Sequence, residues 1–176
     1  MVRYNEFINN TGVEKYMKIR LATMGDLEVI ASMEKACFPE AEAASRESFA
    51  ERLSVFPNHF WLLEEKGKCV SLINGMVTDL PKLQDIMFED ASMHDENGVW
   101  QMIFGVETLP EYQHRGYAGV LMEHVIADAR EQGRKGLVLT CKERLIPFYE
   151  RFGYVNEGIS ESVHGGAVWY DMRLTL

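Results

Sequence analysis

Residues 99–131 limit the possible folds most, because their hydrophobic period changes once within one short stretch. VWQMIFGVETL at 99–109 is rich in β-branched and aromatic residues and predicts a strand. PEYQHRGYAG at 110–119 predicts a glycine-containing turn, and VLMEHVIADAREQG then repeats apolar residues at helical spacing as far as Gly133. A strand that leads through a turn directly into a helix indicates a fold in which helices pack on a sheet.

The segments on either side complete an alternating order. MKIRLAT from Met17 predicts a strand, and Thr23 and Ser45 predict the caps of two helices. HFWLLEE and KCVSLINGMV predict a β-hairpin that turns at Lys66-Gly67. LVLTC, RLIPFYERF and GYVNEG predict strand, helix and strand, and AVWYDMRLTL predicts a last strand after a loop around His164. The sequence therefore predicts an α/β chain of the α+β type, with a mixed sheet and helices on its faces.

Composition narrows the class of protein. The 176 residues include 18 Lys plus Arg and 27 Asp plus Glu, so the net charge of −9 argues against a nucleic-acid binder. The chain lacks a signal-peptide core and a run of apolar residues long enough for a membrane span. Cysteines 37, 69 and 141 form no CxxC pair and no zinc spacing, which predicts a cytoplasmic protein without a metal cluster.

Two segments stand apart from the regular pattern. Residues 1–16 are polar, and we interpret them as an N-terminal extension of a single domain at 17–176. Between Asp79 and Gly98, six acidic residues accompany one base, Lys82. This acidic stretch is either a solvated connection between strands or a mobile flap over an active site.

The turn at 113–119 has the features of an anion site. Small residues between a strand and a helix allow backbone N–H groups to converge, and the helix dipole adds positive charge. A pyrophosphate is a suitable ligand, although plain tight turns before helices are also common. The chain contains neither GxxxxGK[ST] nor GxGxxG with a later acid, so a P-loop and a Rossmann site are not predicted.

Downstream, LTCKERLIPFYERFGYVNEG places Pro147-Phe148-Tyr149 on a short helix before Phe152-Gly153-Tyr154. At these residues the sequence resembles the GNAT acetyltransferases, whose acetyl-CoA motif is Arg/Gln-x-x-Gly-x-Gly/Ala. The segment from Cys141 to Tyr154 is similar to the serotonin (arylalkylamine) N-acetyltransferase branch in particular. The resemblance implies a mostly antiparallel sheet of six to seven strands, acetyl-CoA as co-substrate and no metal.

The resemblance also implies roles for individual residues. The pantetheine of acetyl-CoA would lie beside the backbone of Val106, Glu107 and Thr108, and Tyr149 would be the general acid that protonates the leaving thiolate. The alternative interpretation of Tyr149 is a core tyrosine with a satisfied hydroxyl. The residues expected around the pyrophosphate are Gln113, His114, Arg115, Gly116, Tyr117, Ala118 and Gly119.

The sequence departs from the arylalkylamine branch at its proton acceptor. That branch carries two histidines on the strand before the glycine turn, and here Met102 and Phe104 occupy those positions. We expect these apolar residues to favour an amine with an apolar body. Glu42, His164 or water remain as candidate acceptors of the amine proton.

The leading hypothesis is an acetyl-CoA-dependent N-acetyltransferase that acts on a small primary amine by direct attack in a ternary complex. A catalytically weak acyl-CoA-binding sensor is the second hypothesis, suggested by the missing histidines. The third is a protein or peptide amine acetyltransferase of the same fold. The sequence does not identify the amine or specify an oligomeric state.

Overall fold

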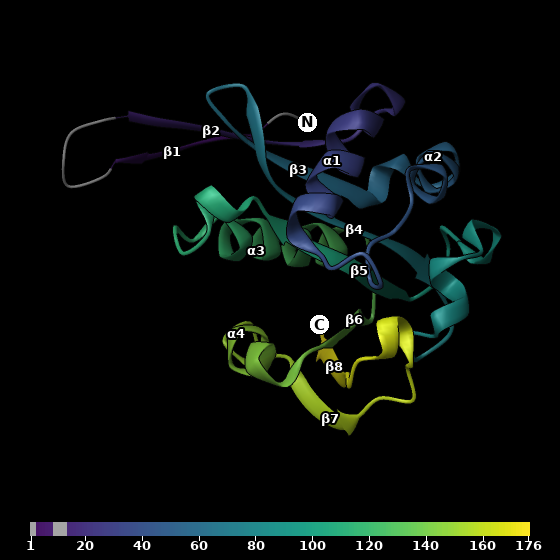
Figure 1. The fold of residues 1–176 in the computed structure, drawn as a ribbon. Helices are drawn as coiled ribbons and strands as arrows, with labels where there is room; N and C mark the ends of the chain where they lie inside the picture. Colours follow the sequence, from purple (N-terminus) through teal and green to yellow (C-terminus); the bar gives the residue numbers. More distant parts are fainter. Residues whose placement is uncertain (1–2, 9–13) are drawn as a thin grey trace.

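The chain folds around one sheet of eight strands, in the order β1-β2-β3-β4-β5-β6-β8-β7 (Figure 1). The structure, a computed structural model, describes residues 3–8 and 14–176. Every pair of neighbouring strands is antiparallel except β5 and β6. The strands are β1 (Arg3–Ile8), β2 (Glu14–Leu21), β3 (Phe60–Glu65), β4 (Lys68–Thr78), β5 (Trp100–Thr108), β6 (Gly136–Cys141), β7 (Val155–Ile159) and β8 (Tyr170–Thr175).

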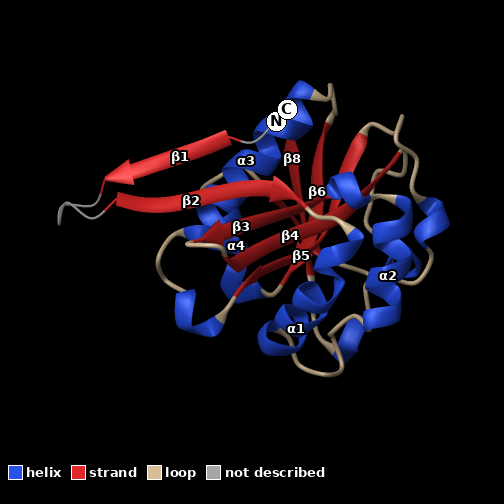
Figure 2. Cartoon of the chain, turned by 90° about the horizontal axis from the view of Figure 1, so that it is seen from above, coloured by secondary structure: helices blue, strands red, loops and turns tan. Residues whose placement is uncertain are grey.

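Helices cover both faces of the sheet, seen from above in Figure 2. They are α1 (Leu27–Cys37), α2 (Arg46–Val55), α3 (Tyr117–Glu131) and α4 (Ile146–Glu150). The hydrophobic core therefore has two parts, one on each face of the sheet. Helices α1 and α2 bury their apolar faces on one side of the sheet, and α3 and α4 bury theirs on the other. The expected mixed, mostly antiparallel sheet with helices on both faces is confirmed, and residues 17–176 contribute seven of its strands.

Local signals account for several element boundaries. Thr23 and Asp26 form the expected capping box before α1, and Ser45 accepts a hydrogen bond from Ser48 N–H at the start of α2. The hairpin between β3 and β4 turns at Lys66-Gly67, where both residues have positive φ, as a two-residue type I′ turn requires. No helix in the described residues is long and apolar enough to cross a membrane.

The N-terminal boundary needs a correction. Arg3–Ile8, which we expected to belong to an appended segment, forms β1 and pairs with β2 along its whole length. The expected boundary at residue 17 falls inside β2, which begins at Glu14. An edge strand joins a sheet through backbone hydrogen bonds, so a polar segment without apolar periodicity can still form one.

The acidic segment at 79–98 forms two short 3-10 turns that pack against the body of the protein. Leu83 and Met87 are buried, and Asp85 accepts hydrogen bonds from Ser162 Oγ and Val163 N–H. The segment is therefore a packed wall rather than a fully solvated connection.

Strand β5 has two irregularities that shape the site. It pairs with β6 only from Trp100 to Met102, so the two strands separate beyond that point. Its register with β4 also shifts, since Asn74 pairs with Gly105 and Gly75 pairs with Ile103, which leaves Phe104 as a bulge. The bulge places the side chains after it on the opposite faces from those that simple alternation predicts.

Candidate active site

A groove of about 1350 Å³ opens where β5 and β6 separate. Its walls come from the start of α3, the edge of β5, the end of α1 and the helix α4. The sequence-predicted residues that line it are Glu42, Val106, Thr108, Gln113, His114, Gly116, Tyr117, Ala118, Gly119 and Tyr149. The structure thus brings most of the expected cofactor residues and Tyr149 to one surface.

The turn before α3 has the geometry of an anion site. Gly116 caps the helix with φ +86°, and His114 also has positive φ. A Cβ at Gly116 would meet no atom within 4 Å, so the space in front of the turn is open. The first turn of a helix leaves amide N–H groups without intrahelical acceptors, and here it includes Ala118 and Gly119. These groups suit a phosphate or pyrophosphate.

Two predicted members of the turn have side chains whose hydrogen bonds stabilise it. Arg115 donates from Nη2 to the carbonyl oxygen of Glu111 at 2.7 Å, and it is absent from the groove lining. The Tyr117 side chain is buried, and its hydroxyl donates to Glu65 Oε1 at 2.6 Å. Both contacts fix the conformation of the chain around the glycine.

Val106 and Thr108 reach the groove along the edge of β5, but Glu107 does not. The carbonyl of Glu107 accepts the Ser71 hydroxyl from β4 at 2.6 Å, whereas the carbonyl of Thr108 accepts from Gln113 Nε2 at 3.2 Å. Backbone groups of an antiparallel strand alternate between its two edges, so the N–H of Val106 points away from β4. The expected backbone contact of Glu107 with a cofactor is therefore not supported.

Tyr149 lies on α4 between the groove and the core. Its ring contacts Phe148 and Tyr154 edge to face, with centroids 5.0 and 5.7 Å away. Burial, with Cys141 close by, raises the pKa of the Tyr149 hydroxyl above its ordinary value. The hydroxyl therefore stays protonated at neutral pH and has a proton to donate.

Three basic residues of the groove were missed by the sequence analysis. Lys142, Arg144 and Arg151 line it around α4. Their signal was present in CKERLIPFYER, where cations flank the short helix on both sides. The Arg151 guanidinium lies 5.0 Å from the centroid of the Phe148 ring, which holds it at the groove. These charges favour an anionic ligand in a protein of net negative charge.

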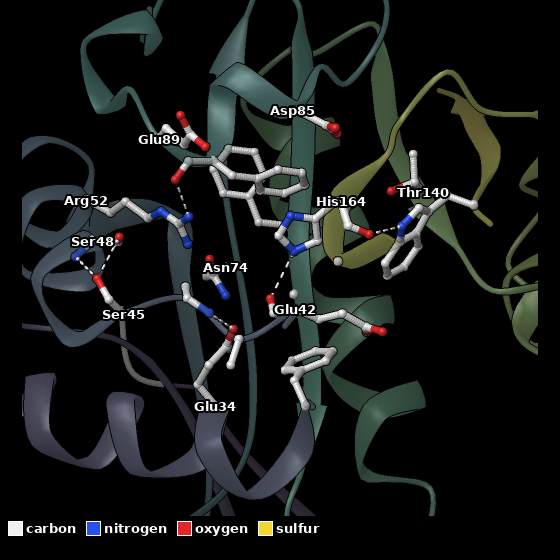
Figure 3. Close-up of a pocket in the computed structure, with 18 of the residues that line it drawn as sticks. Glu34, Glu42, Ser45, Ser48, Arg52, Asn74, Asp85, Glu89, Thr140 and His164 are labelled. Carbon is white, nitrogen blue, oxygen red and sulfur yellow. Dashed lines mark hydrogen bonds between the residues drawn. The ribbon is translucent and has the colours of Figure 1, made fainter. Parts of the chain in front are cut away.

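A second cavity of about 420 Å³ lies beyond the groove, between α1, α2 and the bulged strand β5 (Figure 3). The acidic wall segment closes one side through Asp85, Phe88 and Glu89. Phe38, Glu42 and Trp169 line both spaces. A molecule in the second cavity and one in the groove would therefore meet at this junction.

Glu42 and His164, which are distant in the sequence, lie together at the junction. His164 Nε2 is 2.9 Å from the carbonyl oxygen of Glu42, and because a carbonyl only accepts, Nε2 carries the proton. In the neutral imidazole Nδ1 is then the basic atom. The Glu42 carboxylate accepts from Lys142 Nζ at 2.6 Å. The Glu42 carboxylate is therefore paired with a cation, whereas His164 Nδ1 makes no hydrogen bond within the described residues.

Phe104 and Met102 occupy different environments. Phe104 lines the second cavity, with its ring 5.0 Å from that of Phe88. Met102 is fully buried in the core beneath α1 and α2 and lines neither space. An acceptor in the cavity would therefore contact Phe104, and the expected contact with Met102 is not supported.

A buried pair of carboxyl groups lies at the floor of the second cavity. Glu34 lines the cavity, and its carboxylate accepts a hydrogen bond from Ala44 N–H at 2.7 Å. The carboxyl group of Glu107 approaches that of Glu34 from β5. Burial, the Glu34 charge and the contact with the Glu34 carboxyl raise the pKa of Glu107 well above its usual value, so Glu107 favours its protonated form. Neither carboxyl oxygen of Glu107 accepts a hydrogen bond within the described residues, which leaves Glu34 as the neighbour for its proton. The Oδ1 atom of Asn74 beside the cavity has no hydrogen-bond partner among the described residues. The sequence contained no signal for this cluster, whose members come from α1, β4 and β5.

A separate polar cluster joins the acidic wall segment to the core. The potential metal-binding atoms of His59, His94 and Glu96 lie within 4.8 Å of one another. His94 Nδ1, however, accepts from Val77 N–H at 3.1 Å, so its Nε2 carries the proton and donates to Glu96. Arg134 pairs with the other Glu96 oxygen at 2.7 Å. These hydrogen bonds account for the closeness of the three side chains. The cluster is therefore not offered as a metal site.

Known proteins share this architecture. The family described as Acetyltransferase (GNAT) family matches residues 27–154. "Probable hydrolase YhcX" of Bacillus subtilis (strain 168) is 23% identical over 155 residues. That match covers 84% of this chain but only 30% of the relative, so the chain spans less than a third of that protein.

Solved structures of low sequence identity have the same fold. The loading GNATL domain of CurA from Lyngbya majuscula is 18% identical with a TM-score of 0.79, over 91% of this chain and 98% of that one. The GphF GNAT-like decarboxylase in complex with isobutyryl-CoA is 21% identical with a TM-score of 0.77, over 89% and 98%. Other structures of this fold contain acetyl-CoA, the co-substrate of GNAT enzymes. Because the family match covers both helical layers and the groove between β5 and β6, the chain belongs to the acetyltransferase (GNAT) family.

Proposed function

We propose that this chain is an acetyl-CoA-dependent N-acetyltransferase that transfers acetyl to a small primary amine by direct attack in a ternary complex. One observation carries the proposal: the groove and the second cavity meet at Phe38, Glu42 and Trp169. A thioester in the groove and an amine in the cavity can therefore approach each other from opposite sides without a covalent enzyme intermediate.

The groove suits each part of the cofactor. The pyrophosphate would lie at the N-terminus of α3 near Gly116, with Arg144 and Arg151 as additional positive charges. The pantetheine would pair with the edge of β5 that separates from β6. In this placement the N–H of Val106 polarises the thioester carbonyl.

Acetyl transfer needs a neutral amine and a protonated leaving group. His164 Nδ1 would take the amine proton, with Glu42 positioning the imidazole through its carbonyl oxygen. Attack of the amine then forms the C–N bond and breaks the C–S bond. The Tyr149 hydroxyl would protonate the departing thiolate. These roles remain proposals, as does the placement near the arylalkylamine branch that the segment from Cys141 to Tyr154 suggests.

The test combines binding and turnover. Calorimetry with acetyl-CoA measures binding, and release of free thiol with a panel of primary amines measures transfer. Gly116→Ala should abolish most of the affinity, since a methyl group there projects into the open space before the turn. Gly133→Ala is the matched control, because Gly133 also has positive φ and an open Cβ position but lies at the far end of α3.

Each hypothesis has its own outcome. Tight binding of acetyl-CoA without thiol release for any amine would favour the sensor, and transfer only to peptides would favour the protein acetyltransferase. Equal loss of affinity in both glycine variants would remove the argument for the turn as the pyrophosphate site.

A further inference from the structure

Arg52 on α2 is a buried cation that lines the second cavity. Arg52 is 5% exposed, and its guanidinium points into the cavity from the side opposite His164 (Figure 3). The guanidinium packs against the rings of Phe49 and Phe104, at 5.4 and 5.0 Å from their centroids. A guanidinium in this setting has lost most of its water and needs partners.

The described residues supply few of those partners. Within them, the hydrogen bond of Arg52 runs from Nη2 to the carbonyl oxygen of Phe88 at 2.6 Å. Glu34 and Glu107 act on the guanidinium through their charges, without a hydrogen bond or an ion pair to it. A guanidinium has five N–H donors in a planar fork. The nearest acidic groups, Glu34 and Glu107, are engaged with each other. Donors of Arg52 are therefore left for a molecule in the cavity.

The other polar groups of the cavity have the opposite character. Glu34 and Asn74 Oδ1 offer hydrogen-bond acceptors on the floor near Gly105, one residue before Val106. An amine that attacks a thioester at Val106 would pass these acceptors. Arg52 lies on the α2 side of the same cavity and within electrostatic reach of Glu34, so the space offers acceptors for an ammonium group and donors for a carboxylate close to each other.

We propose that the Arg52 guanidinium binds a carboxylate inside the second cavity, and that the acceptor is an amino acid rather than a simple alkylamine. A carboxylate matches the guanidinium fork with two parallel hydrogen bonds. The aromatic rings of Phe38, Phe88 and Phe104 leave room for an apolar side chain. This inference rests on the proposed function where it names the acceptor.

The carboxylate has a second possible source, because it can belong to the acyl group of the cofactor instead of the acceptor. Malonyl-CoA carries such a carboxylate and acetyl-CoA does not. The experiment therefore has two arms, one for each source.

In the first arm, L-phenylalanine is compared with 2-phenylethylamine, which lacks only the carboxylate, at saturating acetyl-CoA. We expect kcat/KM to be roughly 10- to 100-fold higher for the amino acid, as is typical for a charge-assisted pair. Arg52→Gln should remove this preference by lowering kcat/KM for L-phenylalanine to about the value for 2-phenylethylamine. Arg46→Gln on the exposed face of α2 is the control and should keep the preference.

In the second arm, calorimetry compares malonyl-CoA with acetyl-CoA. Tighter binding of malonyl-CoA that Arg52→Gln abolishes, without a preference for the amino acid, would place the carboxylate on the acyl group and overturn the assignment of the acceptor.

The carboxylate site would be overturned if the wild-type protein has the same kcat/KM for L-phenylalanine and 2-phenylethylamine and the same affinity for malonyl-CoA and acetyl-CoA. This comparison needs no variant. If 2-phenylethylamine is then still acetylated, the proposed function survives the failure of the inference. Conversely, an Arg52-dependent preference for malonyl-CoA without transfer to any amine would retain the site and reject the proposed function.

Discussion

Replacing Glu107 by glutamine should change how the stability of the protein depends on pH. Glu107 is 1% exposed, and burial together with the Glu34 charge raises its pKa well above the usual value. The folded Glu34–Glu107 pair therefore holds one proton that two separate carboxyl groups in the unfolded chain release above about pH 4.3. Such a contribution is fully present below the unfolded pKa and is lost as the pH rises toward the folded pKa.

The magnitude follows from that one proton. While the pair keeps it, the free energy of unfolding falls by about 1.4 kcal/mol for each pH unit. Each pH unit over which the pair keeps the proton corresponds to roughly 3–6 °C in Tm for a chain of this length. In Glu107→Gln the amide donates to Glu34 at every pH, so this part of the pH dependence disappears.

Denaturant unfolding of both proteins from pH 5.5 to 7.5 measures the effect. The difference in the free energy of unfolding between variant and wild type should rise with pH by the amount above, whatever its value at pH 5.5. Glu51→Gln, at an exposed position on α2, provides a control for removing one charge. A difference that stays constant with pH would show that Glu107 is already ionised in the folded protein and would refute the shared proton.

Two further predictions concern the proposed chemistry. Tyr149→Phe should lower kcat by about 10²–10⁴-fold with little change in acetyl-CoA affinity, and because the pKa of Tyr149 is raised, wild-type initial rates should not fall between pH 8 and 10 through loss of this acid. An unchanged kcat, with chemistry limiting turnover, would return Tyr149 to a structural role. Gly165→Ala should lower kcat/KM for the acceptor by about tenfold or more, since its Cβ would lie 2.5 Å from Glu42 Cγ at a φ of +59°. Gly166→Ala, with similar φ and an open Cβ position, should retain activity, and equal losses in both variants would exclude a steric effect on Glu42.

The features that the sequence predicted correctly are those that neighbouring residues determine. The helix cap at Ser45, the hairpin turn at Lys66-Gly67 and the strand–turn–helix around Gly116 each depend on contacts within a few residues. The segment from Cys141 to Tyr154 likewise forms the predicted short helix, α4, soon after β6. Patterns of this kind survive in a linear sequence because the interacting groups are close along the chain.

The N-terminal strand was missed for a related reason. Arg3–Ile8 is held in the sheet by its pairing with β2, and an edge strand needs no alternation of apolar residues. Its polar sequence therefore resembled an appended segment.

The second cavity was decided by the tertiary structure alone. Simple alternation along β5 would place Glu107 on the face opposite Phe104, but the bulge at Phe104 moves Glu107 onto the face of α1, next to Glu34. Arg52 reaches the same cavity from another helix. The sequence by itself determined the glycine turn before α3 and the short helix that carries Tyr149. The carboxyl pair, the buried guanidinium and the meeting of Glu42 with His164 depend on strand register and helix packing, which bring together residues far apart in the chain.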